Sequence, residues 1–325
     1  MEKWKLGILK CKCSKPEFAE DGGRIVCNNC GNTYFLQDNI LCVEEEAEDN
    51  GTKFYEKIQG TRLWERSKVK FTASFFETKI YYQYLERYSP VEKGSLILDI
   101  GCGDGRNTQW FITNGYRHIV GADSNYESLL RLQQRIGAKD KGNILLVKCN
   151  ALNLPFGRNM FDFVIAIEVL YFLNERYEIG LREALRVLRM NGHFMESEPS
   201  WMGMLTWSAV EGDVANTLKT FKEALFKEQF SSSSVLHRVF TPTELEQIYQ
   251  ESNLKIIARS GTSLFPVMFS HAYRAGHIKQ NISPKQMTEI EQMCLKSSVE
   301  EGYHRHIVIY SELRGTHPTQ NEPKP

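Results

Sequence analysis

The fold is decided by residues 95–108, which read Ser-Leu-Ile-Leu-Asp-Ile-Gly-Cys-Gly-Asp-Gly-Arg-Asn-Thr. A short apolar strand runs into a turn that carries Gly101, Gly103 and Gly105, and the sequence predicts a helix at 106–114. Glycines at alternate positions allow a sharp turn and leave no β-carbon between the backbone and a ligand. The first turn of the helix adds free N–H groups. We therefore expect a flat, polar ligand to lie directly on this backbone.

The glycine spacing separates two classes of nucleotide-binding protein. A dinucleotide fingerprint would place its third glycine at position 106, where this chain has Arg106, so NAD and FAD are disfavoured. The spacing Asp-x-Gly-x-Gly-x-Gly resembles instead that of the class I S-adenosylmethionine-dependent methyltransferases. The resemblance implies a seven-stranded, doubly wound α/β domain, and it implies cofactor contacts at Asp99, Gly101, Cys102, Gly103 and Gly105.

A second predicted strand, 118–123, ends in Asp123, eighteen residues after Gly105. A carboxylate at the carboxyl end of the neighbouring strand can accept hydrogen bonds from both ribose hydroxyls. We expect this role for Asp123, with Ser124 beside it. The alternative role for Asp123 is to cap the helix that begins near Tyr126.

The third predicted strand, 143–148, leads into the residues Cys-Asn-Ala-Leu-Asn-Leu-Pro-Phe at 149–156. These residues resemble the family's Asp-Ala-x-x-Leu-Pro-Phe segment, whose acid and following N–H bind adenine. The resemblance implies that Asn150 and Ala151 take these roles. Because Asn150 replaces the acid, its hydrogen bond to the adenine amine would be uncharged and weaker.

A nearly continuous apolar run at 161–173 predicts the fourth strand, since strands of a buried parallel sheet are apolar on both faces. The run resembles the family's Phe-Asp-x-Val segment, and the resemblance implies that Glu168 helps to hold the methionine part of the cofactor. The alternatives for Glu168 are a helix cap and a surface acid. A helix at 175–188 and a fifth strand ending near 198 are expected next.

The chain after residue 198 carries two insertions, 199–240 and 261–303. An amphipathic helix is predicted around 216–230 in the first and a helix near 284–301 in the second. The sequence Thr-Pro-Thr-Glu at 241–244 predicts a capped helix at 242–252, and strands at 254–259 and 306–311 complete the sheet. In related enzymes such insertions form a lid and a substrate pocket. His237 and Tyr171 are the candidates there for a proton acceptor, with a surface or core role as the alternative for each.

Four cysteines near the N-terminus, Cys11, Cys13, Cys27 and Cys30, form two pairs on predicted turns. Four thiolates from two turns can surround a structural zinc ion, which would replace the core that so small a unit lacks. The stretch resembles the zinc-ribbon domain that occurs as a free activator of RNA and protein methyltransferases and as an N-terminal fusion. The alternative is a metal-free β-ribbon whose cysteines act as small hydrophobic residues.

Composition sets the remaining expectations. The 325 residues carry 40 basic and 40 acidic side chains, so overall charge gives no signature of a nucleic-acid or membrane partner. The sequence shows no signal peptide and no apolar segment long enough to cross a membrane, and the cysteine pattern is typical of a reducing compartment. We therefore expect a cytoplasmic protein with a zinc-ribbon-like domain and acidic linker at 1–50, a catalytic domain at 51–313 and a disordered tail at 314–325.

The sequence favours methyl transfer to a small or lipid-like molecule, because the insertions are apolar and aromatic and the net charge is zero. One alternative is an RNA methyltransferase that uses the ribbon and a basic stretch (Arg62, Arg66, Lys68 and Lys70) to bind phosphates. Another is a binding protein that keeps the fold without catalysis. The pattern predicts neither the acceptor nor the oligomeric state.

Overall fold

The structure is a computed structural model that describes residues 1–43, 73–210, 212–230, 233–263 and 304–314, together with some residues between 268 and 293. Four predicted features lie outside the described residues, wholly or in large part: the acidic linker, the basic stretch at 62–70, the helix at 284–301 and the tail after residue 314. No described helix is both long and apolar enough to cross a lipid bilayer.

A central sheet of seven strands confirms the expected catalytic fold. Its strand order is β7-β6-β5-β8-β9-β13-β12, and β13 runs antiparallel to both β9 and β12, whereas the other neighbours are parallel. The strands are β5 (Leu96–Ile100), β6 (His118–Asp123), β7 (Ile144–Lys148), β8 (Phe161–Ile167), β9 (Leu188–Pro199), β12 (Leu254–Ser263) and β13 (His304–Leu313). Strands β6 and β7 lie on one side of β5, and β8 and β9 lie on the other, so the strand order reverses at β5. Open α/β sheets bind ligands at the carboxyl ends of the strands at such a switch point.

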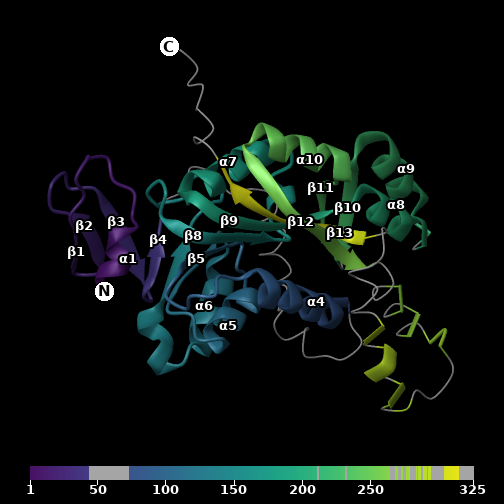
Figure 1. The fold of residues 1–325 in the computed structure, drawn as a ribbon, viewed down its shortest axis with the longest axis horizontal. Coiled ribbons are helices and arrows are strands. Elements are labelled where there is room, and N and C mark those ends of the chain that lie inside the picture. The colour runs from purple at the N-terminus through teal and green to yellow at the C-terminus, as the bar shows by residue number, and fades with distance from the viewer. Residues whose placement is uncertain are drawn as a thin grey trace, which may run out of the picture.

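Helices cover both faces of the sheet, as Figure 1 shows. On one face lie α4 (Ala73–Tyr88), α5 (Arg106–Thr113) and α6 (Tyr126–Arg135), whose buried side chains share a core with alternate residues of the strands. On the other face lie α7 (Tyr177–Val187) and α10 (Pro242–Glu251), which pack into a second core. The capping box predicted at Thr241 and Glu244 is present at the start of α10.

The fourth strand is shorter than predicted. It ends at Ile167, Glu168 takes a left-handed backbone conformation with φ of 58°, and a 3-10 helix η2 (Leu170–Arg176) follows. The first residues of η2 are as buried as the strand, so the apolar run continues past the end of the strand. Hydrophobicity alone therefore could not locate the strand end.

The first insertion also differs from the prediction. Instead of one helix at 216–230 it contains α8 (Trp201–Val210), α9 (Val214–Glu223) and a hairpin of β10 (Leu225–Phe230) and β11 (Ser233–Arg238). Helix α9 ends at Glu223 because Ala224 is left-handed, with φ of 52°. The Asn216 side chain both donates to and accepts from the Lys227 backbone, so α9 and β10 are held together.

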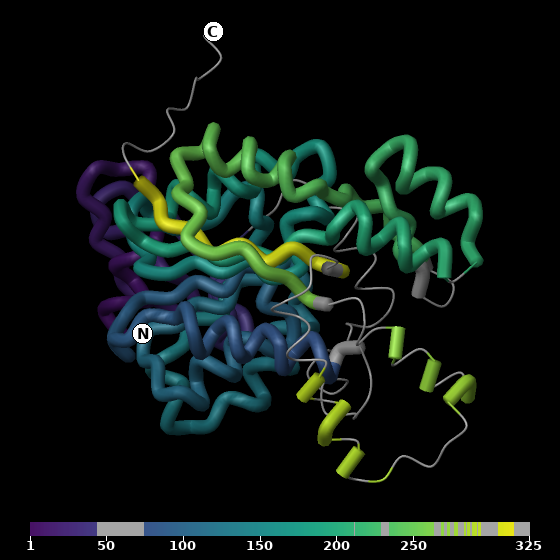
Figure 2. The backbone as a smooth tube through the Cα atoms, turned by 45° about the vertical axis from the view of Figure 1, so that its right-hand side comes forward, coloured from purple at the N-terminus to yellow at the C-terminus, as the bar shows by residue number. Residues whose placement is uncertain are grey.

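The strands of the N-terminal ribbon continue the seven-stranded sheet. It contains α1 (Lys3–Gly7), β1 (Phe18–Asp21), β2 (Arg24–Cys27), β3 (Thr33–Gln37) and β4 (Ile40–Cys42). The four strands form an antiparallel meander, and β4 then pairs in parallel with β7, which gives one sheet of eleven strands. In Figure 2 the ribbon lies at one end of the molecule and α8 and α9 lie at the other.

Candidate active site

The glycine turn presents open backbone at one position. Gly101, Gly103 and Gly105 all have positive φ, at 66°, 53° and 93°. A β-carbon at Gly101 or Gly105 would collide with a neighbouring side chain, whereas one at Gly103 would meet nothing within 4 Å. A ligand can therefore approach the backbone at Gly103. The Cys102 thiol is buried, and burial raises its pKa well above the usual range, so this residue offers a ligand only its backbone.

Asp123 lies beside the glycine turn. One carboxylate oxygen accepts the Gly103 N–H at 2.7 Å and the other accepts the Asn125 N–H at 2.8 Å. The cap of α6 is Asn125, which accepts the Ser128 N–H, so the alternative role considered for Asp123 is taken by another residue. Asp123, with Ser124 next to it, stands at the end of β6 where the ribose role requires a carboxylate.

Asn150 and Ala151 follow β7 and form the next part of this edge. The Asn150 side-chain oxygen accepts the Leu152 N–H at 2.9 Å, which shapes the loop as an Asx turn. Since an amide oxygen has two lone pairs, it still has acceptor capacity for an adenine amine.

Asp99 lies beneath the glycine turn and is fully buried. It accepts the Thr108 hydroxyl at 2.6 Å, and burial raises the pKa of its carboxyl to about 7. This bond ties β5 to α5, so Asp99 supports the turn from below. The turn residues, Asp123 and Asn150 thus meet at the carboxyl ends of three adjacent strands, as the sequence predicted.

A buried ion pair joins Glu168 to Arg106, the residue that replaces the glycine of a dinucleotide fingerprint. The Arg106 Nη2 lies 3.0 Å from the Glu168 Oε2, and the two side chains are 5% and 13% exposed. Burial alone would raise the pKa of Glu168, but the charge of Arg106, its hydrogen bond, and the neighbouring His306 and Arg305 together outweigh burial and lower the pKa to about 2. Tyr81 of α4 donates to the Glu168 Oε1 at 3.0 Å. The sequence interpretation missed Arg106 as a site residue, although its place in the first turn of the helix was the available signal.

His306 and Arg305, at the start of β13, extend this network. The His306 Nδ1 lies 3.4 Å from the Glu168 Oε1, and Arg305 pairs with Glu77 of α4. Glu77, Glu168 and His306 are close enough to share a metal ion. Both carboxylates already pair with arginines, however, so the group is an ion-pair network rather than a preformed metal site.

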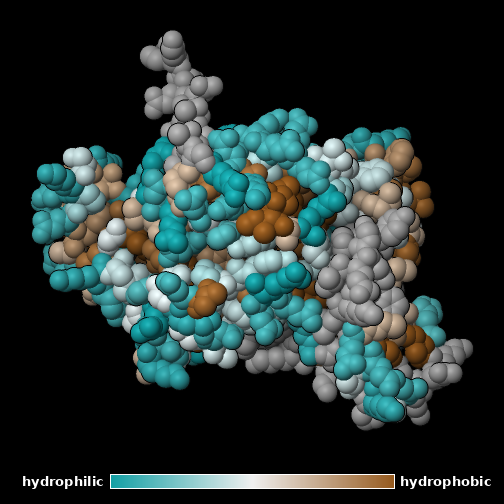
Figure 3. All heavy atoms as spheres, in the orientation of Figure 1, coloured by the Kyte–Doolittle hydropathy of each residue, from teal (hydrophilic) through white to brown (hydrophobic). Residues whose placement is uncertain are grey.

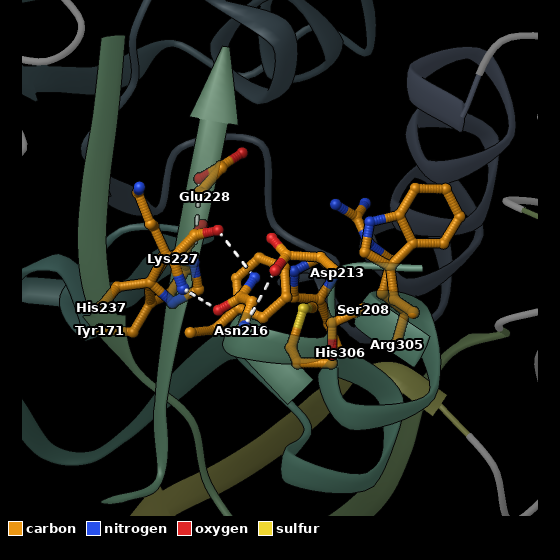
Figure 4. A pocket seen from close by; sticks show the side chains of 12 residues that line it. Tyr171, Ser208, Asp213, Asn216, Lys227, Glu228, His237, Arg305 and His306 are labelled. Carbon is orange, nitrogen blue, oxygen red and sulfur yellow. Dashed lines mark hydrogen bonds and ion pairs between the residues drawn. The ribbon is translucent and has the colours of Figure 1, made fainter. Parts of the chain in front are cut away.

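A cavity of about 390 Å³ lies next to this network, beneath α8 and α9 (Figure 4). Its walls are partly aromatic and apolar, from Met204, Trp207 and Phe226, and partly polar, from Lys227, Glu228 and Arg305. Tyr171 of η2, His237 of β11 and His306 also line it. The structure thus brings the two proton-acceptor candidates, Tyr171 and His237, into one cavity.

His237 is a buried neutral imidazole. Its ring lies 4.7 Å from the Tyr171 ring and 5.4 Å from the Phe226 ring, measured between centroids. Burial, reinforced by the charge of Arg305, lowers the pKa of His237 to about 4. The Nδ1 lies 3.3 Å from the Arg238 carbonyl oxygen, which favours a proton on that nitrogen. The Nε2 is then an acceptor, 3.8 Å from the Glu228 Oε2.

The four N-terminal cysteines converge on one point of the ribbon. Sulfur atoms of Cys11 and Cys13 are 3.5 Å apart, those of Cys11 and Cys30 are 3.4 Å apart, and those of Cys13 and Cys27 are 3.7 Å apart. A zinc ion with four thiolates at about 2.3 Å requires sulfur separations of about 3.8 Å. The donor set and spacing fit a structural zinc, and four thiolates leave no open position for catalysis.

Comparisons with known proteins agree with this geometry. Residues 98–195 match the family described as the methyltransferase domain. The chain is 32% identical over 127 residues to O-methyltransferase rstn1 of Aspergillus nomiae. The aligned residues cover 39% of this chain and 56% of that protein. It is 30% identical over 158 residues to Probable tRNA methyltransferase 9B of Homo sapiens, which covers 47% of this chain and 30% of that protein. The chain therefore spans about half of the first relative's length and less than that of the second.

Among solved structures, the chain is similar to one from the complex between the Haloferax volcanii Trm112 methyltransferase activator and a protein described as a methyltransferase. The TM-score is 0.52 and the identity is 14%. The match covers 83% of this chain and 100% of the other. At this identity the similarity concerns the fold alone.

Proposed function

We propose that the protein is a class I S-adenosylmethionine-dependent methyltransferase, as the match of residues 98–195 to the methyltransferase domain supports, and that it methylates a small molecule held in the cavity beneath α8 and α9. One observation carries the proposal. His306 lines the cavity, and its Nδ1 lies 3.4 Å from Glu168 at the edge of the cofactor site. The cavity therefore ends where a methyl group would be presented.

The cofactor, when bound, supplies an electrophilic methyl group on a sulfonium. The residues proposed to bind it lie at the ends of adjacent strands: Asp123 for the ribose, Asn150 and Ala151 for the adenine, and the Gly103 backbone between them. Arg106 and Glu168 carry opposite charges where the methionine part would lie, so they suit its carboxylate and its ammonium group. The protein mainly has to hold a nucleophile in line with the methyl–sulfur bond.

The cavity also offers a proton acceptor. Two acceptor atoms, the His237 Nε2 and the Glu228 Oε2, lie 3.8 Å apart at the cavity wall, so a hydroxyl or amine of the methyl acceptor can donate a hydrogen bond to one of them. Because His237 is neutral near pH 7, its Nε2 can accept that proton. Tyr171 packs against the imidazole ring and is proposed to position it.

Calorimetric titration with S-adenosylmethionine tests the proposal first, on one sample whose zinc content is also measured. We expect binding by the wild type, no binding of NADH, and affinity at least about tenfold lower for Asp123→Ala, because a charge-assisted hydrogen-bond partner is lost. A folded protein that binds neither compound would contradict the proposal and support the non-catalytic alternative.

Transfer to RNA is the second candidate, favoured by the similarity to Probable tRNA methyltransferase 9B. If RNA is the acceptor, its binding should weaken steeply as salt rises, because phosphate contacts release counterions. Methyl transfer to total tRNA with that salt dependence would favour this candidate. Absent or salt-insensitive binding would favour the small molecule.

We also propose that the four cysteines hold one structural zinc ion. Their sulfur separations support it, and the ribbon between them has few buried side chains of its own. The zinc would stabilise the ribbon, and through the pairing of β4 with β7 it would support the strand that precedes Asn150.

A further inference from the structure

One side chain of α4 contacts both members of the ion pair between Glu168 and Arg106. The Tyr81 hydroxyl donates to the Glu168 Oε1 at 3.0 Å, and the carbon of the Arg106 guanidinium lies 4.8 Å from the centroid of the Tyr81 ring. A guanidinium over the face of an aromatic ring is attracted by the charge distribution of that ring. Tyr81 therefore restrains the acid through its hydroxyl and the arginine through its ring.

The hydrogen bonds of the Tyr81 hydroxyl have a fixed direction. Glu168 is ionised, and a carboxylate only accepts, so the Tyr81 proton goes to Glu168. The Tyr81 oxygen also lies 2.7 Å from the Ser197 Oγ, and the Ser197 hydroxyl is then the donor of that bond. Burial and the charge of Glu168 raise the pKa of Tyr81 well above its usual range, so the phenol keeps its proton. Ser197, Tyr81 and Glu168 thus form a chain of hydrogen bonds that ends on the carboxylate.

The backbone of Glu168 is held by the same neighbour. Glu168 has a φ of 58°, and a residue with a side chain keeps this left-handed conformation only where its surroundings hold it there. Its N–H donates to the Ser197 carbonyl at 3.2 Å. Ser197 therefore holds the backbone of Glu168 directly and the side chain of Glu168 through Tyr81.

Tyr81 itself lies away from solvent and from the cavity. It is 0% exposed, and it does not belong to the residues that line the cavity beneath α8 and α9. The outer face of α4 carries the exposed residues Gln83, Glu86 and Arg87, and Figure 3 shows hydrophilic residues on the surface around this helix. Tyr81 can therefore affect a ligand only through the side chains that it holds.

We propose that Tyr81 is a positioning residue for the amino-acid part of S-adenosylmethionine, because it holds Glu168 and Arg106 in the orientation that receives the ammonium and carboxylate groups. This inference rests on the proposed function, which assigns the ion pair to the methionine part of the cofactor. Loss of the hydroxyl would remove a hydrogen bond from the Glu168 Oε1, so the carboxylate would turn more freely and its charge would no longer be fixed toward the ligand.

The variant Tyr81→Phe tests the inference. Calorimetry compares S-adenosylmethionine with 5′-methylthioadenosine, which lacks the amino-acid part. Phenylalanine keeps a ring against Arg106 and removes only the hydroxyl. We expect the ratio of the two affinities to fall about fivefold, because one charge-assisted hydrogen bond no longer orients Glu168. The fall should come from weaker binding of S-adenosylmethionine, with the affinity for 5′-methylthioadenosine unchanged.

Tyr84→Phe is the matched control. Tyr84 lies on the same helix and is 4% exposed, and its hydroxyl lies 2.7 Å from the Ser260 Oγ and 2.8 Å from the Gly261 carbonyl oxygen. Each variant loses a buried hydroxyl with two partners, so we expect a comparable loss of stability in both. Only Tyr81→Phe should change the affinity ratio. A ratio that falls equally in both variants, or in neither, would overturn the inference.

A third comparison asks whether Tyr81 acts through the ion pair. When Tyr81→Phe is added to the variant Arg106→Met with Glu168→Met, the ratio should change no further, because residues that act as one unit are not additive. A further fall would contradict the inference, since Tyr81 would then act by another route. If the wild type binds neither compound, the proposed function fails and the inference fails with it. If the wild type binds both and Tyr81→Phe keeps the wild-type ratio, the inference alone fails.

Discussion

The Glu168 carboxylate and the Arg106 guanidinium form an ion pair of 3.0 Å at the meeting point of β8 and α5. The Nε and Nη1 of Arg106 have no hydrogen-bond partner among the described residues, and the side chain is buried. A buried guanidinium with unused donors suits a carboxylate ligand. The pair therefore offers both charges that the amino-acid part of S-adenosylmethionine requires.

Replacing both members of this pair should remove recognition of the amino-acid part. The double variant Arg106→Met with Glu168→Met avoids leaving one buried charge alone. We expect the wild type to bind S-adenosylmethionine more tightly than 5′-methylthioadenosine, which lacks that part, and the variant to reduce this ratio at least about tenfold. Calorimetry with both compounds measures the ratio. Asp123→Ala is the control and should weaken the binding of both compounds alike. An unchanged affinity ratio in the double variant would mean that other residues recognise the amino-acid part.

Loss of one thiolate should release the zinc. In Cys30→Ser we expect the metal content to fall from about one ion per chain toward zero, because the hydroxyl is a poor ligand beside three thiolates. Exchange with deuterium should then become faster at the backbone amides of β4. The same is expected of the Val43 N–H, which donates to the Lys148 carbonyl. Cys42→Ser is the control, since Cys42 lies outside the cluster. Full zinc occupancy in Cys30→Ser would contradict the assigned ligand set.

The pKa of His237 can be tested without knowing the acceptor. Because burial lowers the folded-state pKa to about 4, the unfolded chain binds a proton at higher pH than the folded one. Its contribution to stability is therefore complete above the ordinary pKa of about 6.5 and declines as the pH falls toward 4. We expect a histidine ring signal, missing in His237→Gln, that titrates near pH 4 by nuclear magnetic resonance. Titration near 6.5 would show that the ring is solvated rather than buried as the structure has it.

The placement of the proposed cofactor residues could be predicted from the sequence because these residues follow strands, and the carboxyl ends of parallel strands meet at one place. The glycine turn, Asp123 and Asn150 needed only local spacing. Capping signals at Thr241 were equally local and are confirmed.

Features that depend on contacts between distant residues could not be predicted in this way. Arg305 and His306 reach the site from the last strand, which pairs with β9 more than a hundred residues earlier. The end of β8 at Ile167 depends on the backbone of Glu168, whose left-handed conformation no hydrophobic pattern records. Likewise, the ribbon joins the catalytic sheet through the pairing of β4 with β7, and a local motif carries no information on that pairing.

Glu196 offers a test of burial on the opposite face of the sheet. Its Oε1 accepts hydroxyl hydrogen bonds from Tyr177 and Tyr249 at 2.8 and 2.5 Å, while its Oε2 has no partner among the described residues. Burial raises the pKa of Glu196 to about 7. A raised folded-state pKa means that its stabilising contribution is complete below the ordinary pKa of about 4.5 and is lost as the pH rises through 7.

Glu196→Gln should therefore be as stable as the wild type near pH 4.5 and more stable at pH 8, by about 3 kcal/mol. The amide oxygen can still accept both tyrosine hydroxyls, and no charge forms at high pH. Urea denaturation at the two pH values measures the difference. Burial and the charge of Glu196 both raise the pKa of Glu198, so removing that charge favours Glu196→Gln at high pH in the same direction. Glu196→Ala leaves the hydroxyls of Tyr177 and Tyr249 without their acceptor, so it should be destabilised at both pH values. Equal stability of wild type and Glu196→Gln at pH 8 would mean that the carboxylate is ionised at little cost in the folded protein.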